Sequence, residues 1–299
     1  MRYRFFIGML LLPLLVHAEH LFEAGVRAGF SGYDAHCDYI APAGKLHAGM
    51  QLSYSYHSSH IIGCRAGCTI DRQQAGFGRR DYTDSYQTID VEDQLMQVDY
   101  TIGHLQETYT TWSVGLLVQL ALSWHGLNAY VGPKVVFPLS CRWSETAENA
   151  ALSVYYPDYD NRVYESYPLA ASRAFSEAQS GTRDMPLLQW WLSAEICYDI
   201  PVYTGRRFKS YVSIGVYADY SLSEETDKAS DRLSLLMLSD TRDGFPLHRM
   251  MTTVVTANRQ GEQLVSYRKP FDVGIKLAYR FAPYNPLHRN KKTCRCYLY

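Results

Sequence analysis

The amino-acid sequence predicts an all-β fold, an eight-stranded antiparallel transmembrane up-and-down β-barrel with long extracellular loops and short periplasmic turns. Three observations predict it: an export signal, eight segments of strict apolar–polar alternation, and connections that are alternately long and short. Successive side chains of a β-strand point to opposite faces, so alternation gives each strand one apolar and one polar face. Outer-membrane barrels combine such strands with this asymmetry of loops.

The start of the chain has the features of a secretory signal peptide. A basic start, Met1 to Arg4, precedes an apolar run, and small residues ending at Ala18 form a cleavage site. The run spans roughly 12 residues, whereas a membrane-spanning helix needs about 20. We therefore predict that residues 1–18 are the signal peptide, that 19–281 form the outer-membrane β-barrel, and that 282–299 form a periplasmic C-terminal tail.

The clearest strand runs from Phe271 to Phe281. Its odd-numbered positions are all apolar or aromatic, and Asp272, Lys276 and Arg280 occupy alternate positions. Ten residues at about 3.3 Å each, tilted by about 40°, rise roughly 25 Å, which is the height of the apolar band of a barrel. We expect this segment to close the barrel by pairing with residues 21–31.

Seven further segments alternate in the same way. In chain order they span residues 21–31, 46–56, 62–71, 112–124, 127–143, 188–200 and 211–220. The fifth contains Pro133, which has no N–H to donate, so we expect a bulge or a missing ladder bond at this residue.

The connections between these segments alternate between long and short, beginning with a long one. The long connections include the polar segments 72–110, 144–185 and 223–268, and the short ones include residues 57–60, 125–126 and 201–207. Eight strands return both chain ends to the periplasm. A pore or transporter of ten or more strands is an alternative, in which residues 94–106 and 246–259 would supply the extra strands.

Aromatic residues gather at the strand ends, as in the two girdles that mark the membrane boundaries of a barrel. Trp112, Trp143, Trp190 and Phe271 are predicted at the outer boundary, and Trp124 and Phe281 at the inner one.

The opposite face of the strands carries ten charges, five of each sign. They are Glu23, Arg27, Arg65, Lys134, Glu195, Asp199, Asp219, Asp272, Lys276 and Arg280. The interior of an eight-stranded barrel is just wide enough to be filled by side chains. A buried charge without a partner costs several kcal/mol, so we expect a lumen plugged by a network of paired charges.

The remaining composition excludes several function classes. The net charge of -1 lacks the basic excess of a nucleic-acid-binding surface. The seven cysteines fit neither a disulfide framework nor a zinc-site spacing, and alternation predicts that Cys64, Cys68 and Cys141 point outward. We expect neither a metal nor a cofactor.

The strands with the most specific sequences are residues 115–122, 130–140 and 274–281. Through them the chain resembles the small outer-membrane β-barrel proteins of the OmpA/OmpX-like and PorT-like kind found in Bacteroidota. The resemblance implies the cell outer membrane as location, with membrane lipids, including lipopolysaccharide, and the barrel assembly machinery as partners. Family members commonly stop near the terminal aromatic residue, whereas this chain continues for 18 residues after Phe281.

No catalytic motif is present in the sequence, so we predict that the protein is not an enzyme. An outer-membrane rim hydrolase, a protease or a lipid A-modifying enzyme, is an alternative because such sites use Asp and His at the external rim. Its candidate residues are Asp71, Asp219, Asp272 and His248.

The long connection of residues 144–185 is rich in tyrosine. Tyr155, Tyr156, Tyr159, Tyr164 and Tyr167 lie among acidic and serine residues there, a composition suited to adaptable contacts with a surface protein or glycan. The leading hypothesis is therefore a non-enzymatic barrel that acts through its extracellular loops, in surface recognition, adhesion, envelope integrity or assistance to secretion.

Overall fold

The computed structural model describes residues 19–37, 39–57, 61–89, 93–157, 161–162, 175–205, 208–227, 234–239, 248–259 and 262–283. The predicted signal peptide, residues 284–299 of the predicted tail, and Tyr159, Tyr164 and Tyr167 lie outside these ranges. No helix within the ranges could cross a bilayer.

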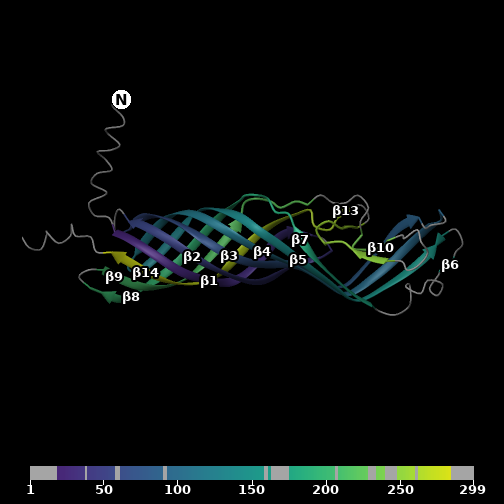
Figure 1. The fold of residues 1–299 in the computed structure, drawn as a ribbon, viewed down its shortest axis with the longest axis horizontal. Helices are drawn as coiled ribbons and strands as arrows, with labels where there is room; N and C mark the ends of the chain where they lie inside the picture. Colours follow the sequence, from purple (N-terminus) through teal and green to yellow (C-terminus); the bar gives the residue numbers. More distant parts are fainter. Residues whose placement is uncertain are drawn as a thin grey trace, which may run out of the picture.

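Eight strands form a closed antiparallel ring in which successive long strands pair side by side (Figure 1). They are β1 (Glu19–His36), β2 (Ala41–His57), β3 (Ile62–Ile89), β4 (Leu95–Trp124), β5 (Leu127–Tyr156), β8 (Gln189–Thr204), β9 (Phe208–Ser221) and β14 (Tyr267–Pro283). The order β4-β3-β2-β1-β14-β9-β8-β5 is closed by the pairing of β4 with β5. The predicted eight-stranded up-and-down barrel is therefore confirmed.

The first and last strands pair with each other and close the barrel, as expected. Phe22 pairs with Phe281, and the ladder continues along the strands to His36 and Tyr267. Pro133 of β5 has no partner in the ladder with β4, which resumes in the same register, as expected for a residue without an N–H.

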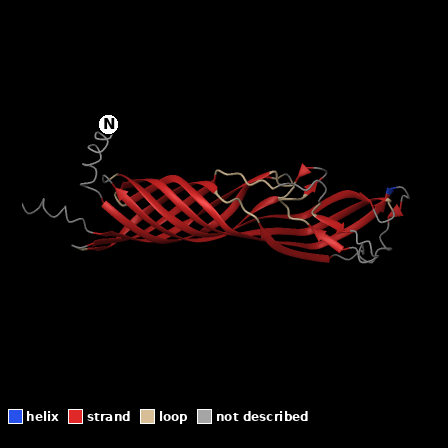
Figure 2. Ribbon diagram, turned by 45° about the horizontal axis from the view of Figure 1, so that its top comes forward, coloured by secondary structure: helices blue, strands red, loops and turns tan. Residues whose placement is uncertain are grey.

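Three strands continue far beyond the barrel as a twisted sheet, which we call the extension. It consists of β3, β4 and β5 beyond the level of Trp112, with β6 (Asn161–Arg162) and β7 (Phe175–Arg183) paired to β5. From Gln73 to Ile89, β3 adds about 55 Å of strand at ~3.3 Å per residue. Figure 2 shows that the barrel strands pass into the extension without a break.

The extension corrects the prediction that residues 72–110 are a polar loop and that 144–185 are a second one. Residues 94–106, the first candidate for an extra barrel strand, belong to β4 and add no member to the ring. The second candidate, 246–259, contributes β11 and β12 to small sheets outside the ring. The extra strands of a wider barrel are thus absent from the described residues.

Simple alternation missed the extension because the facing of the strands reverses within it. Asp81 and Asn149 both have a φ of 54° and lie on either side of Gly103 in the sheet. These three residues form a row across the sheet. Leu105, on the barrel side of the row, and Ile102, on its far side, both point inward and are fully buried, although an odd number of positions separates them. A two-residue period therefore breaks at the same height in three neighbouring strands.

Short strands cap the inner face of the extension. They are β10 (Leu236–Ser239), β11 (His248–Met251), β12 (Asn258–Arg259) and β13 (Glu262–Gln263), which form two small antiparallel sheets. Side chains of the long strands and of the cap form one apolar cluster, including Phe77, Tyr82, Tyr100, Ile102, Leu105, Leu152, Val154, Leu235, Leu236, Val254, Val255 and Leu264. The extension is therefore apolar inside, whereas the barrel is apolar outside.

A bulge in β5 corrects the predicted facing of Cys141 and Trp143. β5 carries one extra residue, Leu139, between its pairings with Trp112 and Ser113 of β4. Beyond this residue the side chains exchange faces, so Cys141 is buried and Trp143 packs against the apolar cluster of the extension. Trp143 therefore does not lie in the outer girdle.

The exposed face of the barrel wall generates a first prediction. Val216 lies in the middle of β9 and is 55% exposed. In a bilayer it would face lipid, so we expect Val216→Arg to lower the free energy of unfolding by about 2–4 kcal/mol. The measurement is urea-induced unfolding in lipid vesicles. Val216→Leu, which keeps an apolar side chain, is the control, and equal stability of the two variants would contradict a lipid-facing wall.

Candidate functional site

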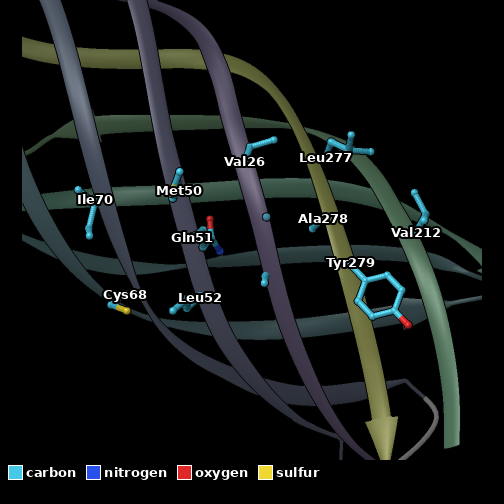
Figure 3. Close-up of a pocket in the computed structure, with 12 residues that line it drawn as sticks. Val26, Met50, Gln51, Leu52, Cys68, Ile70, Val212, Leu277, Ala278 and Tyr279 are labelled. Atoms are coloured by element: carbon cyan, nitrogen blue, oxygen red, sulfur yellow. The ribbon is translucent and has the colours of Figure 1, made fainter.

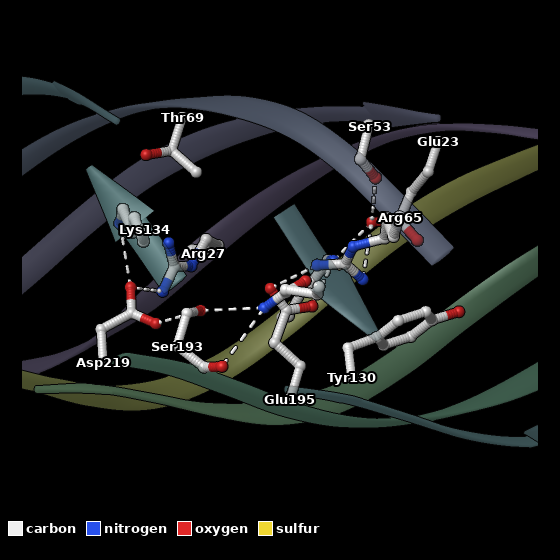
Figure 4. Close-up of polar contacts among 12 residues, drawn as sticks. Glu23, Arg27, Ser53, Arg65, Thr69, Tyr130, Lys134, Ser193, Glu195 and Asp219 are labelled. Atoms are coloured by element: carbon white, nitrogen blue, oxygen red, sulfur yellow. Dashed lines mark hydrogen bonds and ion pairs between the residues drawn. The ribbon is translucent and has the colours of Figure 1, made fainter. Parts of the chain in front are cut away.

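The ten charged residues predicted for the lumen lie on the inner faces of the barrel strands, and the charged groups of all except Asp272 form ion pairs. Asp272 instead accepts a hydrogen bond from the Gln73 side chain. Figure 4 shows the ion pairs as two groups along the barrel axis. We call them the lower cluster, towards the short turns, and the upper cluster, towards the extension.

The lower cluster contains three acids and three bases. They are Glu23, Glu195, Asp199, Arg65, Lys276 and Arg280. Lys276 joins Glu23 to Glu195, and its Nζ lies 2.8 Å from Glu195 Oε2. Arg65 lies 2.5 Å from Glu195, and Arg280 lies 2.6 Å from Glu23. Each charge of the cluster therefore has a partner of opposite sign.

The upper cluster contains two acids and two bases. Lys134 Nζ lies 2.9 Å from both Asp71 and Asp219, and Arg27 lies 2.6 Å from Asp219. Asp71 is absent from the predicted charge network, although it occupies an inward position in the alternation of its strand. Ser193 donates a further hydrogen bond of 2.6 Å to Asp219.

Two tyrosines complete the packing around these charges. The guanidinium of Arg27 lies 3.8 Å from the ring centre of Tyr217, and that of Arg65 lies 4.0 Å from the ring centre of Tyr130. Cation–π contacts of this kind are strongest when water is excluded. Both tyrosines lie at inward positions, which was the only signal in the sequence that could have placed them here.

A third group of charges lies where the barrel meets the extension, and we call it the mouth cluster. Arg268 of β14 contacts Glu225 at 3.0 Å and Asp227 at 2.7 Å. Arg183 of β7 lies 2.6 Å from Asp227, and Gln189 donates to Glu225 at 2.6 Å. All four charged residues come from the predicted long connections 144–185 and 223–268, so alternation had not placed any of them.

These clusters leave little space inside the barrel. The void between the upper cluster and the mouth cluster measures about 20 Å³ and is lined by Gln73, Ser113 and Glu225, among others. Such a void has room for about one water molecule, not for a solute. The larger hollow of about 580 Å³ in Figure 3 lies among apolar side chains of the wall, including Val26, Met50 and Leu277, and is not part of a channel.

The predicted girdle residues other than Trp143 lie near the ends of the barrel wall. Trp112, Trp124 and Trp190 are 47%, 68% and 52% exposed. Phe271 is half-buried, and the ring of Phe281 lies 5.3 Å from that of Phe208.

The structure changes the setting of two tyrosines that were candidates for ligand binding in a loop. Tyr155 and Tyr156 are the last residues of β5, paired with Arg162 and Asn161 of β6. Tyr156 is buried in the apolar cluster, so its side chain is not available at the surface. Tyr155 is half-buried.

The candidate residues of a rim hydrolase are not gathered at an open rim. Asp71, Asp219 and Asp272 are each 1% exposed inside the barrel. His248 begins β11 in the cap. Within the described ranges no group of His, Cys, Asp or Glu residues is arranged to hold a metal ion.

A closed antiparallel ring combines an apolar outer wall with paired charges inside. The architecture is that of a small transmembrane β-barrel. The chain matches no protein-family model and no curated protein sequence.

Among solved structures, the chain is similar to Ail, the attachment invasion locus protein of Yersinia pestis. In its complex with the heparin analogue sucrose octasulfate, Ail has 10% identity and a TM-score of 0.26. A second Ail structure has 8% identity and a TM-score of 0.27, and each comparison covers 88% of this chain and 99% of Ail. The InvG secretin β-barrel of the Salmonella injectisome has 8% identity and a TM-score of 0.12, over 97% of this chain and 70% of InvG. At these scores the comparisons add nothing to the fold established by strand pairing.

Two buried carboxyl groups lie side by side on neighbouring strands of the extension. Glu107 of β4 pairs with Glu145 of β5, and neither is exposed. Glu107 accepts a hydrogen bond of 2.7 Å from the Val254 N–H of the cap, and Glu145 accepts one of 2.7 Å from Gln179. Burial raises the pKa of Glu107 to about 7. Burial and the neighbouring Glu107 raise the pKa of Glu145 well above its ordinary value.

The lower cluster gives a second prediction. Lys276→Met leaves Glu23 and Glu195 with less positive charge in a buried site, so we expect a loss of about 3–5 kcal/mol in the free energy of unfolding. Glu195→Gln should recover part of this loss in the double variant, because it removes the excess negative charge. Unfolding of the wild type, both single variants and the double variant measures the coupling, and strictly additive losses would contradict a shared cluster.

The neighbouring carboxyl groups of Glu107 and Glu145 give a third prediction. Their pKa values are raised in the folded extension, so their contribution to stability is present at low pH and is lost as the pH rises from about 4.5 through about 7. Ionisation places two negative charges beside the cap, where Asp227 adds to the repulsion and Arg183 opposes it. We therefore expect the cap to open more readily in alkaline solution.

Amide hydrogen exchange of residues 252–256, corrected for the intrinsic rate, measures this opening at about pH 5.5 and about pH 8.5. Glu145→Gln should reduce the difference between the two conditions. Glu148→Gln is the control, because the Glu148 side chain is 60% exposed. Equal protection of the wild-type cap at both pH values would refute this role of the carboxyl pair.

Proposed function

We propose that this protein is a non-enzymatic outer-membrane barrel that holds a folded β-sheet extension outside the cell for contact with other molecules. The barrel supplies the membrane anchor, and the extension supplies the contact surface. Surface recognition and adhesion are the roles that fit this arrangement.

The observation that carries the proposal is the contrast between a filled lumen and an extension with its own core. The lower, upper and mouth clusters lie in the interior of the barrel, which argues against a path for a solute. The apolar cluster of the extension joins three long strands to the cap, which supports a rigid external body instead of a set of separate loops. A rigid surface loses little conformational entropy when it binds.

The apolar wall supports the outer membrane as location. Exposed side chains such as Val26, Ile196 and Ile275 cover the ring between the levels of the tryptophans, and lipid would shield them from water. The short turns would then lie in the periplasm, as the predicted export signal requires. Lipids of the outer membrane, the barrel assembly machinery during insertion, and a surface protein or glycan remain the proposed partners.

The two other functions have less support. A pore needs a continuous lumen, and the ion pairs oppose one. A rim hydrolase needs an acid and a base that open to solvent together, whereas Asp71 and Asp219 are buried and neutralised by Lys134. Buried carboxylates of this kind are not suited to catalysis on a lipid or a peptide.

Surface labelling tests the proposal as a fourth prediction. Thr101 is exposed on the outer face of the extension, and Lys209 is exposed near the short turns. A membrane-impermeant maleimide should label Thr101→Cys in intact cells above the wild-type background, and Lys209→Cys only after the outer membrane is permeabilised. The purified protein should also be electrically silent in planar bilayers. The reverse labelling pattern, or stable single-channel conductance, would overturn the proposed function.

A further inference from the structure

A groove at the edge of the extension, where β2 ends, collects positive charge. It has a volume of about 880 Å³ and lies between the β1–β2 connection and the neighbouring parts of β3 and β4. Its charged lining residues are Lys45, Arg79 and Arg80, His104 lines it as well, and no carboxylate from the described part of the chain does. We call it the basic groove. Its size is that of a ligand-binding cleft.

The end of strand β2 creates the groove. β2 begins at Ala41, which pairs with Gly78 of β3, so Arg79 and Arg80 lie just past the last pair of this ladder. Gly78 lines the groove, and a Cβ at this position would meet only one atom, Leu105 O at 3.4 Å. A larger residue would fit there but would extend into the groove, so the glycine leaves the groove open. Tyr39 and Ile40, which precede Ala41, line the opposite side.

The basic side chains that line the groove are held in a defined arrangement. Arg79 donates a hydrogen bond to the Tyr39 carbonyl, which ties its guanidinium to the wall of the groove. Arg80 and His104 are directly opposite each other on the outer face of β3 and β4. Arginine presents a planar set of N–H donors that matches phosphate and carboxylate groups.

Acidic groups lie at the margin of the groove and not in it. Asp81 follows Arg80 in β3 and is exposed. Glu148 lies opposite His104 on the far side from Arg80, with 3.9 Å between its Oε2 and His104 Nδ1. Neither side chain lines the groove, so the described lining residues carry only positive formal charge.

The position of the charges indicates the shape of the ligand. Lys45 is next to Leu46, which is 66% exposed at the edge of the apolar wall. Arg80 lies further along the extension, about 20 Å of strand away at ~3.3 Å per residue. A single phosphate could not reach both ends, whereas an oligosaccharide with several negative groups could.

We propose that the basic groove binds an anionic oligosaccharide that carries phosphate or carboxylate groups. This inference rests on the proposed function, because it names the ligand class of the extension. Lys45 contacts the ligand end nearest the membrane, and Arg79 and Arg80 contact the distal end. Gln106 supplies uncharged hydrogen-bonding groups for sugar hydroxyls.

Binding by the purified full-length protein in detergent micelles tests the proposal. The probes are a delipidated, phosphorylated core oligosaccharide, the same oligosaccharide attached to lipid A, and an uncharged dextran oligosaccharide. We expect binding of the phosphorylated probes, weakening with added salt, and no binding of dextran. The double variant Arg79→Gln/Arg80→Gln should bind about tenfold more weakly.

Arg142→Gln is the matched control, because Arg142 is an exposed arginine of the same sheet that does not line the groove. Its affinity should stay within about twofold of the wild type. Groove-dependent binding of the delipidated probe supports a free glycan as ligand, and groove-dependent binding of the lipid-linked probe alone supports a membrane glycolipid. Binding that is unchanged in the double variant, or equal for dextran, overturns the proposal. Correct surface labelling of Thr101→Cys together with either result would leave the proposed function standing.

Discussion

The pairing of charges inside the barrel is the constraint on which the rest of the structure depends. An eight-stranded ring exposes one face of each strand to its own interior, and that interior is too narrow for bulk water. Lys276 and Lys134 each contact two carboxylates, so removing one base affects several neighbours at once. Replacing one such group alone lowers the free energy of unfolding, because its former partner is then a buried charge that has lost its hydration and has no opposite charge beside it.

The same three strands serve two different surroundings. In the barrel, β3, β4 and β5 direct apolar side chains outward and polar ones inward, whereas in the extension they direct Tyr82, Ile102 and Val154 inward. The bulge at Leu139 and the interruption at Gly103 allow this change without ending the strands. A continuous backbone ladder therefore joins the barrel to the extension, and the mouth cluster adds side-chain contacts across the junction.

A filled barrel with a continuous extension differs in its mechanics from a barrel with loose loops. The cap contributes apolar side chains to the core of the extension, and the backbone N–H of Val254 is tied to the buried Glu107. Surfaces of this sheet, including the basic groove at its edge, are consequently held in place before any ligand arrives. Preorganisation of this kind favours specific contacts made by a few well-placed side chains.

The sequence by itself determined the barrel. Alternation along residues 271–281 and along seven other segments identified the eight strands, the closing pair and the inward charges, because facing in a regular strand depends only on counting by two. Asp71 was within reach of the same rule. Counting fails wherever a strand gains or loses one residue, so Cys141 and Trp143 were assigned to the wrong face, and residues 72–110 were assigned to a loop.

Only the tertiary structure decided which charges meet, how far the strands continue and where a groove forms. The partners Arg183, Glu225 and Arg268 come from distant parts of the chain, and only the folded barrel brings them together. Lys45 and Arg80 are likewise unremarkable in the sequence. They become parts of one surface because β2 ends beside Gly78, and the end of a strand is set by its packing against its neighbours and not by its own residues.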